Sequence, residues 1–463
     1  NSGSSVSDKN PAPYLYHGVS FFTRGTYNYA DRYLATVTFR ADGSSKYNKK
    51  WGFFPSGGLG WVLTSEPYMK DSLPFDFLKL RLSWGMLGND NVPANSTVIL
   101  GSVGTSVSGV FGDNLVDGIG AQTVYQNYLR WEVVNEYDAG VDFTILEGRL
   151  SGELDYYDRT TENVVFYVPI ATGGGTAELL SNNGTVRNSG FEFTLGWSDF
   201  VGEDITYNIG LNLTTVSNKV VELQGRDYIP GASVRGNYST RTQVGLPIGA
   251  FWGYIVDGVF ASDQEVSDHP IQQEIMAPGY FKYRDMDGNR IINENDKTYL
   301  GSPIPRLTGG LDFGFAWKNL DFGLTLYWQL GNKILNAKRM NRDVFTDGNY
   351  DLDFYQNAWR PGRTSDTYPS AAAYNSAFVQ QANSFFVEDA SYFRIQNIQV
   401  GYTFRNFSKI DMMRVYFSAQ RPLTLFRYNG FTPEVGGSPI ANGVDTSTYP
   451  MQAICTLGLR MSF

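Results

Sequence analysis

The sequence predicts an all-β fold, a transmembrane antiparallel β-barrel with long extracellular loops. Three observations support this prediction. Aromatic residues make up 15% of the 463 residues and charged residues only 18%, and there are 50 glycines. Apolar and polar residues alternate strictly over long segments, and the connections between these segments are alternately short and long. The chain is therefore rich in residues that favour strands and tight turns, and poor in the charged residues that usually cover the helices of soluble proteins.

The alternation predicts about thirteen strands. They lie near residues 18–28, 31–41, 54–64, 76–87, 135–146, 149–160, 188–197, 205–216, 306–317, 320–332, 393–404, 414–423 and 454–463. Long loops are expected near 42–53, 88–134, 161–187, 217–305, 333–392 and 424–453. Short turns on one side and long loops on the other are typical of outer-membrane barrels, which have even strand numbers in bacteria. Thirteen strands therefore predict that residues 1–463 form the C-terminal part of a larger barrel.

The segment around Lys318-Asn319 carries the clearest hairpin pattern. If these two residues form the turn, Trp317 pairs with Leu320, and every further apolar residue on one side pairs with an apolar residue on the other. A soluble β-sandwich alternates in the same way. A membrane strand is favoured because residues 320–328 span about 20 Å when tilted. The apolar face of the hairpin also ends in Trp317 beside the turn and in Trp328 at the far end, like the aromatic girdles of barrels.

The last segment predicts a closing strand. Cys455, Leu457, Leu459, Met461 and Phe463 alternate with small or polar residues, and Phe463 is the last residue. A lipid-facing side and a water-facing side explain this pattern better than a frayed terminus does.

Charge and cysteine content exclude several classes of protein. The net charge is −9 and lysine and arginine do not cluster, so no nucleic-acid partner is expected. A single cysteine excludes an internal disulfide and a cysteine-based zinc site. No apolar run is long enough for a membrane helix, and no signal peptide opens the chain, so we expect either a processed protein or an internal starting point.

A series of ordered motifs spans residues 33 to 463. These motifs are Arg40-Ala-Asp42-Gly43-Ser44-Ser45, Trp51-Gly-Phe53-Phe54-Pro55-Ser56, Leu78-Lys-Leu80-Arg81-Leu82-Ser-Trp84-Gly85, Leu129-Arg-Trp131-Glu132, Asp155-Tyr156-Tyr157-Asp158-Arg159-Thr160, Val186-Arg187-Asn188-Ser-Gly190-Phe-Glu192, Pro278-Gly279-Tyr280-Phe-Lys-Tyr-Arg-Asp285, Gly301-Ser302-Pro303-Ile-Pro305, Glu388-Asp389-Ala-Ser391-Tyr-Phe393-Arg394 and Pro433-Glu434-Val-Gly. The series resembles the barrel of the SusC/RagA family, TonB-dependent nutrient transporters of the Gram-negative outer membrane.

The resemblance implies a barrel of about 22 strands with a plug in its interior. The plug domain and the TonB box, through which TonB acts, are not expected in this chain. A SusD-like surface lipoprotein is the implied lid, and an oligosaccharide or a peptide is the implied ligand. The complex is either one transporter–lid pair or a dimer of such pairs, and the sequence does not favour either oligomeric state. The resemblance thus implies a transporter, not an enzyme. The alternative is a self-contained passive porin or a surface glycan-binding β protein.

One loop carries a candidate calcium site. Asp285, Asp287, Asn289 and Asp296 take positions 1, 3, 5 and 12 of a twelve-residue loop, and the carbonyl of Ile291 takes position 7. The usual glycine at position 6 is replaced by Arg290. The alternative is an exposed turn rich in Asp and Asn that binds no ion. No other cofactor is expected.

Catalytic chemistry has little support in the sequence. The two histidines, His17 and His269, lie outside any nucleophile motif. Asp312 and Asp321 alternate with glycine and are expected to line a polar channel. Gly173-Gly174-Gly175 is expected to be a flexible loop, since it lacks the features of a phosphate loop. The run Phe251-Trp252-Gly253-Tyr254 is expected to pack loops together.

Overall fold

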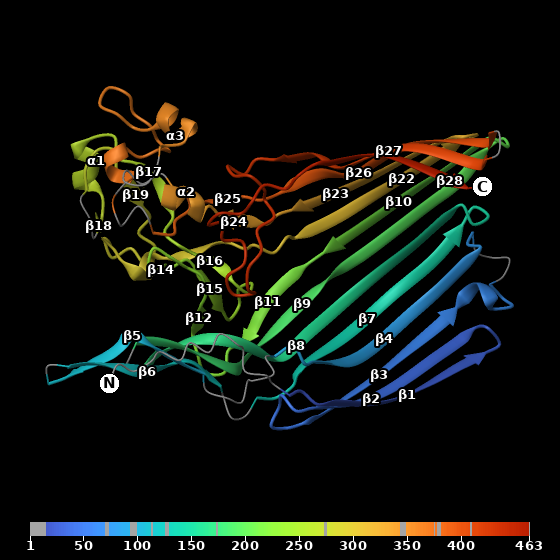
Figure 1. Cartoon of the computed structure of the whole chain (residues 1–463), viewed down its shortest axis with the longest axis horizontal. Helices are drawn as coiled ribbons and strands as arrows, with labels where there is room; N and C mark the ends of the chain where they lie inside the picture. Colours follow the sequence, from blue (N-terminus) through green and yellow to red (C-terminus); the bar gives the residue numbers. More distant parts are fainter. Residues whose placement is uncertain are drawn as a thin grey trace. The chain divides into compact units, whose positions relative to one another are not determined.

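The computed structural model describes residues 15–69, 74–92, 100–112, 114–125, 129–172, 175–272, 276–342, 349–374, 376, 381–407 and 410–462. Thirteen long strands follow one another in a single sheet order, with antiparallel partners wherever the register is defined (Figure 1). In that order they are β1 (Gly18–Tyr29), β2 (Tyr33–Ser44), β3 (Trp51–Val62), β4 (Phe77–Asn89), β7 (Glu132–Ile145), β8 (Leu150–Thr172), β9 (Gly175–Val201), β10 (Ile205–Thr215), β22 (Leu307–Trp317), β23 (Leu320–Leu330), β26 (Tyr392–Phe407), β27 (Ile410–Phe426) and β28 (Ile454–Ser462). The predicted all-β fold and its thirteen strands are confirmed.

Further strands and short helices occupy the connections. They are β5 (Leu100–Phe111), β6 (Asn114–Tyr125), β11 (Ser217–Glu222), β12 (Tyr228–Pro230), β13 (Ser233–Val234), β14 (Asn237–Tyr238), β15 (Thr240–Gln243), β16 (Ala250–Gly253), β17 (Val256–Val259), β18 (Ile271–Gln272), β19 (Phe281–Tyr283), β20 (Ile291–Ile292), β21 (Thr298–Gly301), β24 (Lys333–Leu335), β25 (Val387–Asp389), the 3-10 turns η1 (Leu63–Ser65) and η2 (Glu294–Asp296), and the helices α1 (Asp263–Asp268), α2 (Ala337–Arg342), α3 (Leu352–Asn357) and α4 (Ala371–Tyr374). Within the described residues, every helix is too short or too polar to cross a membrane.

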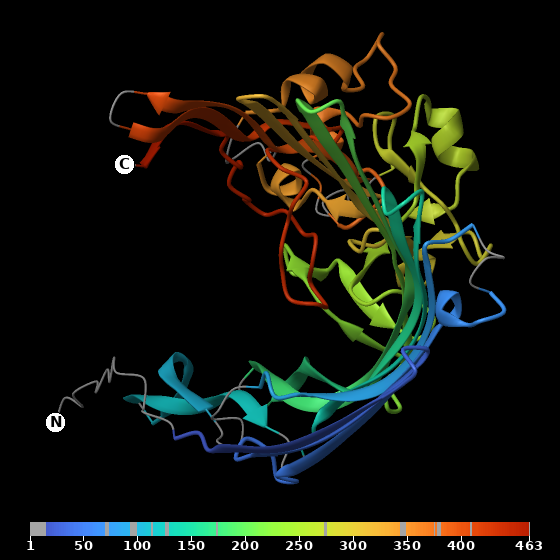
Figure 2. The ribbon, with the colours of Figure 1, turned by 90° about the vertical axis from the view of Figure 1, so that its right-hand side faces the viewer.

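The chain divides into two compact units. The first unit comprises Asn1–Gly60, Leu82–Tyr137 and Arg159–Val186, and the second comprises Trp61–Arg81, Asp138–Asp158 and Arg187–Phe463. In the second unit β10, β22, β23, β26, β27 and β28 lie side by side (Figure 1), and the short elements between β11 and β25 gather beyond the end where β22 begins (Figures 1 and 2).

The hairpin of β22 and β23 has the predicted register. Trp317 pairs with Leu320, Phe315 with Phe322, Phe313 with Leu324 and Leu311 with Leu326. Lys318 in the turn has φ of +52°, which the two-residue turns favoured in hairpins require. Because every pair joins two apolar residues, one side of the hairpin is continuously apolar and the other carries Asp312 and Asp321.

The same division runs across the neighbouring strands of the second unit. The register continues the apolar face through Val400 and Phe417 and the polar face through Gln399 and Ser418. Val400 and Phe417 are 41% and 47% exposed although β26 and β27 each have a strand on both sides. A soluble sandwich would cover these side chains with a second sheet. The sandwich alternative therefore fails, and the exposed apolar face is of the kind that meets lipid.

Two of the predicted loop segments are corrected. Residues 161–187 mostly extend β8 and β9, and β5 and β6 lie within 88–134. The extension has a packing reason, because Leu180 on β9 joins Tyr47, Phe54, Leu129 and Trp131 in a buried cluster of the first unit. Burial of this kind does not require alternation along the strand, so the sequence pattern missed it.

The segments 217–305 and 333–392 are not plain loops. They share one buried core, which includes Phe251, Phe281, Tyr283, Phe354 and Phe386. We call this the loop core. Its aromatic rings contact one another closely; the ring centroids of Phe281 and Phe385 are 5.2 Å apart. The two segments therefore form a folded subdomain, and not a set of independent loops, beyond the end of the strands at which β22 begins.

Candidate functional site

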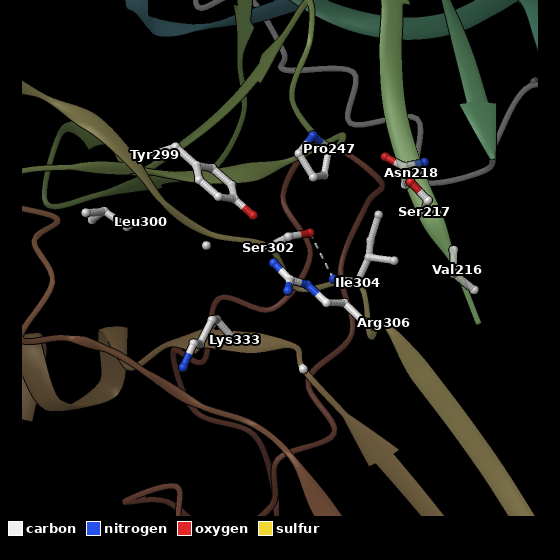
Figure 3. A pocket seen from close by; sticks show the side chains of 12 residues that line it. Val216, Ser217, Asn218, Pro247, Tyr299, Leu300, Ser302, Ile304, Arg306 and Lys333 are labelled. Carbon is white, nitrogen blue, oxygen red and sulfur yellow. Dashed lines mark hydrogen bonds between the residues drawn. The ribbon is translucent and has the colours of Figure 1, made fainter. Parts of the chain in front are cut away.

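A pocket of about 560 Å³ lies in the second unit, where β22 begins and β23 ends (Figure 3). It has the size of a small-molecule site. Its lining comes from four separate stretches of chain: Val216, Ser217, Asn218, Pro247, Tyr299, Leu300, Gly301, Ser302, Ile304, Arg306, Gly331 and Lys333. We call it the Arg306 pocket.

Backbone hydrogen bonds fix the position of Arg306. Its N–H donates to the carbonyl of Leu330 at 3.0 Å, and its carbonyl accepts from the N–H of Val216 at 3.0 Å. Arg306 therefore continues the pairing of β22 with β10 and β23 by one residue. Even-numbered residues of β22 belong to the polar face, so Arg306 stands on that face in register with Asp312.

The electrostatics of the pocket are positive. Arg306 and Lys333 are cations, and none of the lining residues is acidic. The Nζ of Lys333 lies 3.6 Å from Oδ2 of Asp389, whereas the Arg306 guanidinium has no ion pair or hydrogen bond within the described part of the chain. Burial raises the pKa of the Tyr299 phenol and the charge of Arg306 opposes this rise, so Tyr299 stays a neutral hydroxyl donor.

A second pocket of about 390 Å³ adjoins the first and shares Ile304 and Lys333 with it. Asn332 lines it and is only 3% exposed, and its Oδ1 has no hydrogen-bond partner among the described residues. Glu434, also in the lining, accepts hydrogen bonds from Tyr392 and Arg394 of β26. The end of the polar face is therefore concave and polar over a larger area than one pocket.

Ion pairs cross-link the polar face further along the strands. Nε of Arg81 lies 2.7 Å from Asp142 and its Nη2 lies 2.9 Å from Asp155, and Arg414 binds Asp321. These pairs join three strands in the first case and connect β27 with β23 in the second. These ion pairs distinguish this part of the polar face from Arg306, which forms no ion pair with any described residue.

The predicted calcium loop is compact. One carboxylate oxygen from each of Asp285, Asp287 and Asp296 lies within 4.8 Å of the others. Arg290 adopts φ of +64°, the left-handed conformation for which the usual glycine is selected. Asp296 is fully buried and accepts from the N–H groups of Met286 and Asn293, both at 2.8 Å.

Local hydrogen bonds already engage the exposed part of this loop. Asp285 accepts from the N–H groups of Gly288 and Arg290, at 2.7 and 2.8 Å. Desolvation acts to raise the pKa of Asp285, but these N–H donors outweigh it and lower the pKa. Asn289 Oδ1 accepts from the N–H of Ile291 at 2.7 Å, and Ile291 itself pairs with β18. An Asp-rich turn without an ion explains these bonds as well, so calcium stays a prediction.

Comparison with known proteins decides the family. The family described as "TonB dependent receptor-like, beta-barrel" matches residues 3–420. The chain belongs to this family. It is a family of receptors, so the expectation that the chain is not an enzyme is confirmed, as is its place in the outer membrane of a Gram-negative bacterium.

Individual relatives agree with this assignment. The chain is 31% identical to the TonB-dependent receptor SusC of Bacteroides thetaiotaomicron, over 96% of the chain and 44% of the relative. It is 31% identical to the TonB-dependent receptor P3 of Formosa agariphila, over 96% of the chain and 45% of the relative. The resemblance to the SusC/RagA type is confirmed. The chain spans about half the length of these relatives.

A solved structure shows the same fold. The structure of the RagAB peptide transporter superposes on this TonB-dependent receptor barrel with a TM-score of 0.79 at 22% identity, covering 97% of the chain and 48% of the other.

The other predicted residues of this receptor barrel pack against aromatic rings, are exposed, or lie outside the described residues. His269 stacks edge-on against Phe260, with ring centroids 5.0 Å apart, and His17 is exposed. Phe251 and Tyr254 are 1% exposed in the loop core, which confirms the packing interpretation of that run. Gly173, Gly174 and Phe463 lie outside the described residues. The Arg306 pocket was not predicted, because its lining is scattered from Val216 to Lys333.

The calcium prediction has a direct test. Titration of the calcium-free complete receptor with CaCl2 is expected to show one site with a Kd of about 10⁻⁴–10⁻³ M, as in extracellular modules. Asp287→Asn removes one ligand charge and should weaken binding about tenfold. Glu294→Gln is the control, because Glu294 is 73% exposed and pairs with Lys297. Absence of binding heat, or equal calcium affinity of Asp287→Asn and the unmodified receptor, would exclude a calcium site in this loop.

Proposed function

We propose that the complete receptor imports oligosaccharides or peptides across the outer membrane, energised through TonB and assisted by a SusD-like lipoprotein lid. The two faces of the strands carry this proposal: one face is exposed and apolar, and the other is polar and holds ion pairs and pockets. Similarity to SusC and to the RagAB fold supports the choice of a nutrient importer.

In this proposal the described residues bind the ligand and the lid and give the transporter a rigid wall. The cross-linked polar face forms a stiff wall, since Arg81 and Arg414 each hold carboxylates of other strands. The loop core stands where the pockets are and provides the surface that a lid contacts. Ligand contacts form in the Arg306 pocket and its neighbour.

Uptake in the native bacterium tests the function. Deletion of the gene for the complete receptor is expected to abolish uptake of a fluorescent oligosaccharide or peptide that supports growth, and complementation should restore it. A protonophore should stop the restored uptake, because TonB uses the proton-motive force. Uptake that depends on the gene but continues with the protonophore would contradict this proposal and favour the passive-porin alternative.

A further inference from the structure

The Arg306 pocket combines features that point to a ligand of one chemical class. We propose that it binds a carboxylate group of the ligand, with the Arg306 guanidinium as the principal contact. The passage of a ligand past this pocket rests on the proposed import function, but the inference is tested by binding alone.

The Arg306 pocket is positively charged. The chain carries a net charge of −9, and 46 acidic residues are available to pair with 37 basic ones. The arginines Arg81, Arg187 and Arg414 each pair with an aspartate. Arg306 does not pair with any described residue, and its pocket has no acidic lining. The pocket is therefore positively charged within an acidic protein, and an anion is the ligand that would complement it.

The hydrogen-bond donors of the pocket are directed into one space (Figure 3). Figure 3 shows the Tyr299 hydroxyl and the Arg306 guanidinium directed into the same space, with Ser302 beside them. Ser302 Oγ accepts the N–H of Ile304 at 3.1 Å, so its own hydroxyl hydrogen remains available. Three kinds of donor thus converge. A planar guanidinium binds a planar carboxylate through two parallel hydrogen bonds, which selects this anion over a single point acceptor.

Backbone contacts hold the pocket and Arg306 in place. Besides the two backbone bonds of Arg306, the N–H of Lys333 donates to the carbonyl of Ser302 at 2.8 Å. Gly331 lies so close that an added Cβ would stand 3.2 Å from Cβ of Arg306, and its φ of +83° favours glycine. The stem of Arg306 is therefore confined, and less conformational entropy is lost when the guanidinium binds.

Lys333 contributes less than Arg306. Figure 3 shows its ammonium turned away from the guanidinium, and Asp389 lies 3.6 Å from it. It adds positive potential at the rim of the pocket and does not complete the carboxylate fork. We therefore expect substitution of Arg306 to change carboxylate binding strongly and substitution of Lys333 to change it little.

Two matched pairs of probes test the proposal on the complete receptor in detergent. The first pair is trigalacturonate and its methyl ester, and the second is a tetrapeptide with a free C-terminal carboxylate and its C-terminal amide. Calorimetry is expected to show at least about tenfold tighter binding of the charged member in one pair, since a charge-assisted hydrogen bond contributes that much. The pair that shows the difference identifies the source of the carboxylate, a sugar acid or a peptide end.

Variants assign the effect to the pocket. Arg306→Gln is expected to remove the preference for the charged probe. Arg306→Lys keeps the charge but not the fork and should retain only part of the preference. Lys318→Gln is the control, because Lys318 is 60% exposed in the hairpin turn at the other end of β22. Should Arg306→Gln fail to fold, Tyr299→Phe removes one hydroxyl donor and should weaken the charged probe a few-fold.

The result that would overturn the proposal is equal binding of both members of each pair by the unmodified receptor. A preference that persists in Arg306→Gln would also overturn it, because the carboxylate would then bind elsewhere. Neither result affects the import proposal, which is judged by uptake and its response to a protonophore.

Discussion

Leu324→Arg is expected to prevent stable assembly of the receptor in the outer membrane. Leu324 lies in the middle of β23 on the apolar face, opposite Phe313 of β22 and Ile398 of β26. If that face meets acyl chains, an arginine there costs about 2–4 kcal/mol near the bilayer midplane. This is a large part of the stability of a folded protein. The folded, heat-modifiable band on unboiled gels should be strongly reduced.

The adjacent residue provides a matched control. Gly323 lies on the polar face, and an added Cβ there would meet no atom within 4 Å. Gly323→Arg places the same charge one residue away but toward water, so assembly should be nearly unchanged. Equal loss of the folded band in both variants would contradict the assignment of the two faces. Loss in Gly323→Arg alone would reverse it.

Phe281→Ala is expected to unfold the loop core while the long strands stay assembled. Phe281 is fully buried, and its ring centroid lies 5.2 Å from that of Phe385 and 6.0 Å from that of Tyr283. Removing a buried phenylalanine ring costs about 3–5 kcal/mol through lost contacts and the cavity left behind. Hydrogen exchange of the segment 250–301 should increase strongly, and ligand and lid binding should fall with it.

Val244→Ala is the control for this substitution. Val244 is 46% exposed in the same part of the chain, so truncation should change exchange little. If Phe281→Ala also leaves exchange unchanged, the loop core is not the cooperative unit described above. If it abolishes the heat-modifiable band, the stability of the loop core and the stability of the strands are not separable.

The long strands could be predicted because their signal is local. In the hairpin at Lys318-Asn319 each apolar residue faces the same side as its partner, so the pattern and the register support each other. The second half of β8 and the first half of β9 could not be predicted in this way. Leu180 is buried by residues as distant in sequence as Tyr47, and such packing leaves no periodic trace.

The same distinction explains the candidate sites. Asp285, Asp287 and Asp296 come from one twelve-residue loop, so their spacing alone predicted that they would gather. The Arg306 pocket needs residues of β11, β21 and β24 together, and only the fold brings these elements to one site. One signal was present in the sequence: Arg306 is a cation directly before a strand whose next charged residue is Asp312.

Spin-label accessibility tests the central claim, that one face of these strands meets lipid and the other meets water. In a Cys455→Ser background, single cysteines are introduced at residues 321 to 326 of β23 in the complete receptor, reconstituted in bilayers. Labels at Phe322, Leu324 and Leu326 should be accessible to oxygen, and labels at Asp321, Gly323 and Thr325 to a water-soluble nickel complex. Accessibility to oxygen without a period of two residues, or with the opposite phase, would contradict the claim.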